Sequence, residues 1–506
     1  MIHSERRRYY RPVNSKARIS ALSCVLALCA APGCDDPEPE LDDANLKFRD
    51  ASDPALSATY TECVDAGEFG GRDVVIRYPM GHNCLSTLAD SPIVLVLHGA
   101  GFAYTTYPYL LDHLAQNGFI AVSADVLADE TPSAHDGHTA AAATAIGILD
   151  DMRANWAFGS EIDPSRLAIV AHSRGGMTAA YIANELEGNG DPWTVRAIVK
   201  LAGKENGPYP IDGNASKGLL LLQGAVDTDQ EAQVGFQNYD NSGTEGAPDG
   251  LHKSMKLFEF GDHEGFSTRD GLTDQAHVTK GYVLAFLAAH VLGDWTWYED
   301  YIRGDDVPWG WVGRIAGQFS EGLTRIVIDN FEDNQFSIAT IPFGSVSKTL
   351  GTSASVLDLA GNSDIQHDTH ALQASGSVSG DYVQWTFPSV DVELYKSLSL
   401  RIGQVDGAAS SSVSVQIRNA NVWQPAVLLS TYGTIEPPMT MCQKGNTACT
   451  PADFELEAHM GTIRVPLSAL GNRDAVDGVR LVFTIKSTAR TYVVDSLEFA
   501  GSVFMP

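Results

Sequence analysis

Short apolar runs alternate with helical patterns of apolar and polar residues between about residues 56 and 304. Several runs are continuously apolar, which is typical of parallel strands that are buried on both faces. We therefore predict an α/β fold with a mostly parallel sheet flanked by helices. The predicted strands are Val74–Tyr78, Ile93–Leu97, Ile120–Ala124, Leu167–Ala171, Ala197–Leu201, Leu219–Leu222 and Lys256–Phe260.

The pattern changes after a stretch rich in tryptophan and glycine around residues 308–317. In residues 326–506 the helical periodicity is lost, and short segments alternate between apolar and polar residues, as in Val413–Ile417. Turn-forming Gly, Asn, Ser and Asp separate these segments. A period of two with frequent turns predicts an all-β sandwich, and residues 305–325 are then the linker that precedes it.

The N-terminus has the pattern of an export signal, because basic residues precede the apolar run Ile19–Ala31. Residues 1–33 are therefore predicted to be a signal peptide. The stretch Ala31-Pro32-Gly33-Cys34 resembles a bacterial lipoprotein processing site, after which Cys34 would carry the lipid; the alternative is ordinary cleavage nearby. The polar residues 34–55 then form a tether. We expect a cell-envelope lipoprotein that contacts the membrane through its anchor only, or otherwise a secreted protein.

The formal net charge is −29, although charged residues make up only 19% of the chain and hydrophobic residues 44%. This composition supports packed cores. Removal of the basic signal peptide would make the remaining chain more acidic still. Such a chain repels nucleic acid, so we expect no nucleic-acid partner.

The cysteines agree with export. Two lie in the predicted signal peptide and Cys34 is the predicted lipid site, which leaves an even number. Proximity in the sequence favours the pairs Cys63 with Cys84 and Cys442 with Cys449, although four cysteines allow three pairings. Disulfides of this kind belong to an oxidising compartment.

Ser173 is the candidate nucleophile. It follows the apolar strand Leu167–Ala171 in the segment Ala171-His172-Ser173-Arg174-Gly175-Gly176 and precedes an alanine-rich helical pattern. Small residues two before and two after the serine permit a sharp turn that projects the hydroxyl above the sheet. The usual pattern has Gly at the position of Ala171.

A serine nucleophile requires a base and an acid, which this arrangement supplies in the order Ser, Asp, His. Asp227 follows the strand Leu219–Leu222 and is the predicted acid; Asp229, two residues on, is the alternative. His263 follows the next strand and is the predicted base.

The loop His98-Gly99-Ala100-Gly101 leaves an apolar strand, and its glycines allow backbone amides to approach a ligand closely. Ester cleavage builds negative charge on oxygen, which backbone amides stabilise. We predict that the amides of Ala100 and Arg174 form the oxyanion hole.

Together these motifs resemble the bacterial polyester hydrolase (cutinase-like) and platelet-activating-factor acetylhydrolase branch of the α/β hydrolases, over about residues 60–304. The segments that carry the resemblance are His98–Gly101, Leu114–Val122, Ala171–Gly176 and Val278–Tyr301. It implies an α/β-hydrolase domain over residues 56–304 with Ser173, Asp227 and His263 as a catalytic triad. Polyester hydrolases place an aromatic residue at Ala100 and usually Met at Arg174, so the resemblance implies ester hydrolysis more than polyester cleavage.

The C-terminal part resembles galactose-binding-like jelly-roll modules. The resemblance rests on Ile328–Asp333 and Thr491–Phe499. It implies a structural calcium with hard oxygen ligands, and the candidates are Asp329, Glu332 and Asp495. It also implies a polysaccharide partner bound through Trp385 or Trp423, unless both tryptophans belong to the core.

The sequence therefore predicts a serine carboxylic-ester hydrolase (EC 3.1.1 type) that acts through an acyl-enzyme on lipid-like or short-chain esters. No cofactor is expected for catalysis. Two alternatives stay open: a non-catalytic surface protein that binds carbohydrate, and a peptidase on the same fold.

Overall fold

The computed structural model describes residues 53–502, apart from 80–83, 85–87, 127–134, 188–189, 206–210, 212, 230–231, 244–250, 270, 309–310, 312, 321–324, 350, 361, 363–364, 368, 407–411, 445–448 and 485–489. These described residues fall within one compact unit of the chain. The predicted signal peptide, Cys34 and most of the tether lie outside them. Among the helices that are described, none combines the length and the apolar character needed to cross a membrane.

In the described part of residues 62–320, nine strands form one sheet, and its six central strands are parallel. The outer pairs β1–β2, β2–β4 and β8–β9 are antiparallel. The spatial order is β1 (Glu62–Phe69), β2 (Arg72–Pro79), β4 (Ile120–Ala124), β3 (Ser91–Leu97), β5 (Ile162–His172), β6 (Val195–Leu201), β7 (Gly218–Gly224), β8 (His252–Phe258) and β9 (Ile315–Ser320).

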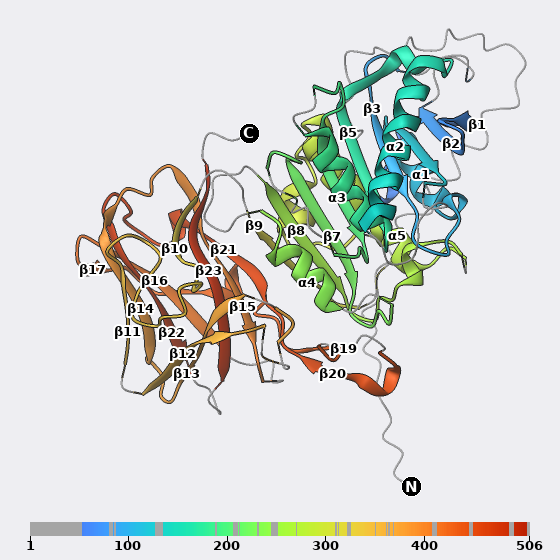
Figure 1. Cartoon of the computed structure of the whole chain (residues 1–506). Helices are drawn as coiled ribbons and strands as arrows, with labels where there is room; N and C mark the ends of the chain where they lie inside the picture. Colours follow the sequence, from blue (N-terminus) through green and yellow to red (C-terminus); the bar gives the residue numbers. More distant parts are fainter. Residues whose placement is uncertain are drawn as a thin grey trace, which may run out of the picture. The chain divides into compact units, whose positions relative to one another are not determined.

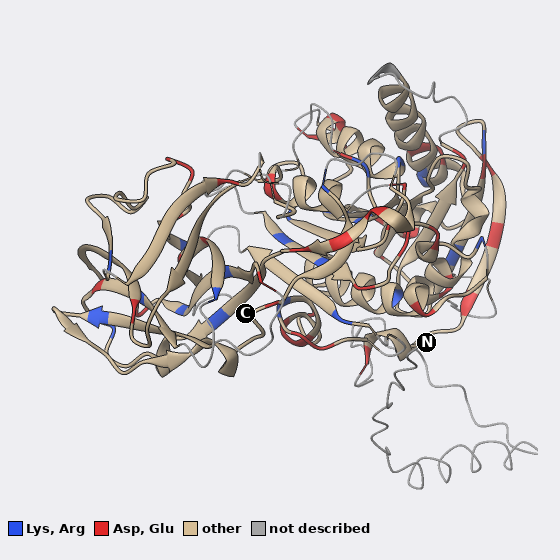
Figure 2. Cartoon of the chain, turned by 90° about the horizontal axis from the view of Figure 1, so that it is seen from below, with Lys and Arg blue, Asp and Glu red and all other residues tan. Residues whose placement is uncertain are grey.

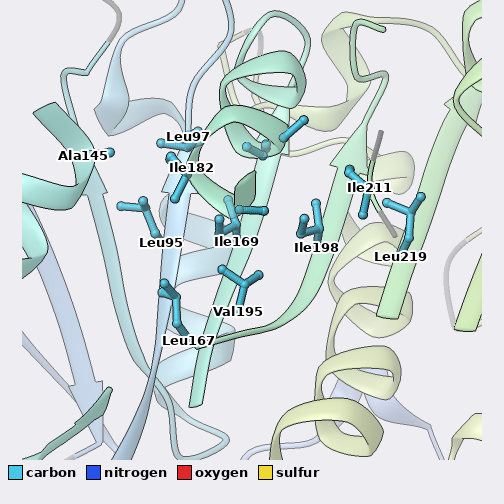
Figure 3. Close-up of a cluster of buried hydrophobic side chains, with 14 of the residues drawn as sticks. Leu95, Leu97, Ala145, Leu167, Ile169, Ile182, Val195, Ile198, Ile211 and Leu219 are labelled. Atoms are coloured by element: carbon cyan, nitrogen blue, oxygen red, sulfur yellow. The ribbon is translucent and has the colours of Figure 1, made fainter. Parts of the chain in front are cut away.

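Helices cover both faces of this sheet (Figure 1). The helices are α1 (Pro108–Ala115), α2 (His135–Asn155), α3 (Gly175–Leu186), α4 (Ala232–Asp240) and α5 (Asp274–Leu287). The core on one face joins α2, α3 and α4 to the strands, and the core on the other joins α1 and α5. Figure 3 shows the first core, where side chains such as Leu95 and Ile169 meet Ala145 of α2 and Ile182 of α3. Burial on both faces explains why these strands read as continuous apolar runs.

Two expectations about strands differ from the structure. Strand β8 covers His252–Phe258 and not residues 256–260, because Lys253 and Lys256 lie inside it with their ammonium groups bonded to backbone carbonyl oxygens. Residues 315–320, within the expected linker, form β9 and pair with β8. The mixed sheet with its helices fits the α/β-hydrolase fold.

The described C-terminal residues form two six-stranded antiparallel sheets and a two-stranded hairpin, an arrangement compatible with a β-sandwich. One hydrophobic cluster draws side chains from both six-stranded sheets. The first sheet contains β10 (Arg325–Asp329), β12 (Thr352–Asp358), β13 (His370–Gly376), β15 (Tyr395–Gln404), β21 (Gly461–Pro466) and β23 (Thr491–Ser502). The second contains β11 (Ser345–Lys348), β14 (Tyr382–Val390), β16 (Ser412–Asn419), β17 (Val422–Trp423), β18 (Val427–Leu428) and β22 (Val476–Thr484). The hairpin is β19 (Met439–Cys442) with β20 (Phe454–Glu457).

The structure contains the disulfides Cys63–Cys84 and Cys442–Cys449. The first ties the start of β1 to the segment after β2, and the second closes the segment that joins β19 to β20. Figure 2 shows acidic positions scattered along the described ribbon.

Candidate active site

Ser173 occupies a strained turn between the end of β5 and the start of α3. Its φ is +53°, a left-handed conformation that costs a residue with a side chain about 1–2 kcal/mol. The following glycines permit close approach of neighbouring backbone: a Cβ at Gly175 would lie 2.8 Å from the carbonyl oxygen of His98, and one at Gly176 would lie 2.9 Å from Cα of Gly203. The turn therefore fits tightly between the loops that leave β3 and β6.

Both backbone groups of Ser173 are held by the end of β6 and the loop that follows it. Its amide donates to the carbonyl of Leu201 (2.9 Å), and its carbonyl accepts from the amide of Lys204 (2.8 Å). The buried ammonium of Lys200 donates to the Lys204 carbonyl (2.9 Å) and to Oδ1 of Asn238 (3.0 Å). Burial lowers the pKa of Lys200 to about 7. Sequence reasoning missed Lys200, because a lysine inside an apolar strand carries no motif.

Asp227 and His263 form the predicted acid–base pair. Nδ1 of His263 lies 2.9 Å from Oδ2 of Asp227, and the Asp227 side chain is fully buried. The side-chain Nε2 of Gln223 donates to the same carboxylate oxygen at 3.3 Å. Asp229 is exposed, and its backbone amide donates to Oδ1 of Asp227 (2.9 Å). The imidazole of His263 is thus paired with Asp227 and not with the alternative acid, Asp229.

The other ring nitrogen of His263, Nε2, is buried and has no hydrogen-bond partner among the described residues, Ser173 included. Catalytic hydrogen bonds in ligand-free enzymes are often long and tighten when substrate binds. Burial opposes a charge on His263, but the hydrogen bond and charge of Asp227, with Asp229 and Glu264, outweigh it and raise the pKa of this histidine. A free Nε2 on a ring with a raised pKa suits a proton acceptor.

The loop expected to form the oxyanion hole lies against the nucleophile. A Cβ at Gly99 would come within 2.8 Å of Cβ of Ser173, so only glycine fits there. The exposed Ala100 follows in the same turn. Arg174 is the N-cap of the twelve-residue helix α3, whose N-terminus carries a partial positive charge. The two predicted amides therefore belong to the loop and the turn that border Ser173.

The three carboxylates expected to bind calcium do not come together. Each has a different partner: Asp329 accepts from Nε1 of Trp385 (2.7 Å), Glu332 from Nδ1 of His370 (3.1 Å), and Asp495 from the guanidinium of Arg401. Across the residues that the structure describes, no group of three or more His, Cys, Asp or Glu side chains is arranged to hold a metal ion. The guanidinium of Arg401 places a positive charge beside the carboxylate of Asp495.

The two tryptophans considered for sugar binding differ in exposure. Trp385 is fully buried in the β-sheet core. Trp423 is half-buried, and the guanidinium groups of Arg480 and Arg418 lie 4.3 Å and 5.7 Å from its ring centroid. Of this pair only Trp423 presents part of its ring to solvent.

Comparison with known proteins identifies similarity over part of the catalytic region. Residues 85–196 match the family model described as Chlorophyllase, an α/β-hydrolase-type esterase family. Two curated relatives, chloroplastic Chlorophyllase-1 of Citrus unshiu and of Citrus sinensis, are each 33% identical to the chain over 88 residues, which is 17% of this chain and 27% of theirs. The chain thus spans about a quarter of the length of these relatives.

This similarity supports membership of the α/β-hydrolase superfamily. The matched residues include Ser173 and the loop that contains Ala100, whereas Asp227 and His263 lie beyond residue 196 and depend on the geometry described above. The cutinase-like branch and the galactose-binding-like module stay predictions from the sequence.

Proposed function

We propose that the protein is a serine carboxylic-ester hydrolase that works through an acyl-enzyme. The observation that carries the proposal is the buried contact of 2.9 Å between Asp227 and His263, beside a serine in a strained strand-to-helix turn. Similarity to an esterase family over the segment that contains Ser173 supports the same activity.

In the proposed reaction, Nε2 of His263 removes the proton from Oγ of Ser173 as this oxygen attacks the ester carbonyl. Asp227 holds the imidazole by Nδ1, which leaves Nε2 as the acceptor, and it stabilises the imidazolium that forms. The imidazolium then protonates the departing alcohol. A water molecule, activated by His263 in the same way, releases the acid from Ser173.

The tetrahedral intermediates carry a negative charge on the former carbonyl oxygen. We assign its stabilisation to the backbone amides of Ala100 and Arg174. Loss of one such donor typically reduces kcat by about 10²–10³-fold. The N-terminus of α3 adds a favourable dipole at the same place.

The decisive experiment compares Ser173→Ala with the wild type on short-chain p-nitrophenyl esters and with a fluorophosphonate probe. We expect the variant to lose turnover by about 10⁴-fold or more and to lose labelling, while its melting temperature is maintained. Ser254→Ala is the matched control, because Ser254 is a buried serine outside the site. Its hydroxyl donates to the backbone carbonyl oxygen of Gln318 (3.2 Å). Full activity of the Ser173 variant would overturn the proposal.

The same experiment separates the two other candidate functions. A non-catalytic carbohydrate-binding protein would show neither turnover nor labelling of Ser173 in the wild type, whereas a peptidase would be labelled and would cleave amide substrates. The half-buried Trp423 is the feature that favours a polysaccharide partner.

We further propose lipid-like or short-chain esters as substrates and export as a lipoprotein anchored at Cys34. The two disulfides support export, because such bonds persist in oxidising compartments.

A further inference from the structure

A chain of buried hydrogen bonds connects three segments around the nucleophile. The amide of Gly99 lies 3.4 Å from the hydroxyl of Tyr107, and this hydroxyl lies 2.8 Å from Nδ1 of His172. Nε2 of His172 lies 3.1 Å from the carbonyl oxygen of His263. Tyr107 is fully buried, and His172 and His263 are nearly so.

The chemistry of these groups fixes the direction of every bond in the chain. A carbonyl oxygen can only accept, so Nε2 of His172 must carry the proton and donate it to His263. Nδ1 of His172 then bears a lone pair, and the hydroxyl of Tyr107 donates to it while accepting from Gly99. Burial lowers the pKa of His172 well below its usual range, so the ring is neutral and holds a single proton. Burial also raises the pKa of Tyr107, so its hydroxyl stays protonated.

This chain of hydrogen bonds contacts three parts of the proposed catalytic site. Gly99 precedes Ala100 in the oxyanion loop after β3. His172 precedes the nucleophile at the end of β5. The carbonyl acceptor belongs to His263, the base, in the loop after β8. The rings of His172 and His263 also pack together, with centroids 4.7 Å apart.

We propose that Tyr107 and His172 are positioning residues that hold the oxyanion loop, the nucleophile and the base in reactive register. This proposal rests on the esterase function proposed above. Neither residue exchanges protons with substrate. They act by holding three loops in fixed positions relative to one another. The proton on Nε2 of His172 sets the donor and acceptor of each hydrogen bond that links these loops.

A purely structural role would need only the ring of Tyr107, so Tyr107→Phe tests the hydroxyl alone. The variant leaves the Gly99 amide without its acceptor and leaves the buried lone pair on Nδ1 of His172 without its donor. The hydroxyl link between the oxyanion loop and His172 is then lost, while His172 still donates to the carbonyl oxygen of His263. The oxyanion loop is then free to move relative to the nucleophile and the base.

We expect Tyr107→Phe to reduce kcat for p-nitrophenyl acetate by about tenfold, with KM changed by less than about twofold, because two buried bonds that set the reactive geometry are lost. The rate of inactivation by a fluorophosphonate should fall in parallel. Tyr282→Phe is the matched control: Tyr282 is equally buried, its hydroxyl donates to the carbonyl of Asp306 (3.3 Å), and we expect its kcat to stay at the wild-type value.

A second pair of variants tests His172 directly. Glutamine retains an amide donor for His263, so His172→Gln should keep more activity than His172→Leu, which removes both bonds. An inactive, unlabelled wild type would contradict the esterase function itself. A wild type that is active, with Tyr107→Phe within about twofold of it in kcat, or with glutamine no better than leucine at position 172, would overturn the positioning role alone.

Discussion

Replacement of Asp227 by asparagine tests the centre of the proposed site. In the structure Oδ2 of Asp227 faces Nδ1 of His263 at 2.9 Å, and the carboxylate is fully buried. Asparagine keeps the shape but lacks the charge that holds a proton on Nδ1. The imidazole is then free to carry its proton on Nε2, where it cannot accept one from Ser173. In triads of this kind the change reduces kcat by about 10⁴-fold, close to 5 kcal/mol in the barrier.

The same variant predicts a change in pH dependence. In the wild type the base must lose its proton before it can act, and its pKa is raised because Asp227, aided by Asp229 and Glu264, outweighs the effect of burial. We therefore expect kcat/KM to rise with pH through an apparent pKa above about 6.5, the ordinary value for histidine. Asp227→Asn removes the strongest of the raising causes, so the acidic limb of its residual activity should move to lower pH.

Asp229→Asn is the control for this experiment. Asp229 is exposed and touches the site through its backbone amide, which the substitution preserves. We expect its kcat to stay within about threefold of the wild type, because an exposed charge is screened by solvent. Initial rates with a p-nitrophenyl ester between pH 5 and pH 9 measure both variants. The assignment of the acid would be refuted if Asp229→Asn lost activity and Asp227→Asn did not.

Two further predictions address how the nucleophile is held. Gly99→Ala places a methyl group 2.8 Å from Cβ of Ser173, so we expect the free energy of unfolding to fall by about 1–3 kcal/mol and kcat to fall by about tenfold or more, measured by thermal melting and initial rates. Gly147→Ala is the control, because no atom lies within 4 Å of the added Cβ, and we expect it to keep the stability and kcat of the wild type. Lys200→Met should flatten the pH dependence of stability: between the usual pKa of lysine and its lowered value of about 7, the unfolded chain binds a proton that the folded chain does not, so wild-type stability falls as pH drops through this range. Urea unfolding at pH 7 and pH 9 measures the change in the free energy of unfolding with pH. An equal change in the wild type and in Lys200→Met would contradict the lowered pKa of the buried lysine.

The sequence predicted the central sheet well because burial on both faces leaves a clear signal. Ile93–Leu97 is continuously apolar and Ile120–Ala124 is apolar apart from Ser123, and the two lie within the observed β3 and β4. The signal failed at the start of β8, because Lys253 lies before the predicted first residue, Lys256. Their ammonium groups reach backbone carbonyl oxygens, a compensation that only the folded chain reveals.

The candidate site shows a similar division. Motif spacing indicated Ser173, and chain order indicated His263 and favoured Asp227 over Asp229. Both aspartates follow the same strand, and packing places Asp227 against the imidazole of His263. Tyr107 could not be found at all, since its role depends on residues at positions 99, 172 and 263 that meet only after folding.

The carboxylate of Asp495 shows why the sequence around a buried acid does not identify its counter-charge. Asp495 is a fully buried carboxylate on β23, and such a group needs a positive partner. A metal ion and a guanidinium both meet that need, and the sequence near Asp495 is the same in either case. The register of β15 against β23 makes the difference, because it sets Arg401 directly opposite Asp495. The neutralising charge thus comes from Arg401, a residue 94 positions away in the sequence. The register of β15 against β23 therefore determines which positive group lies beside Asp495.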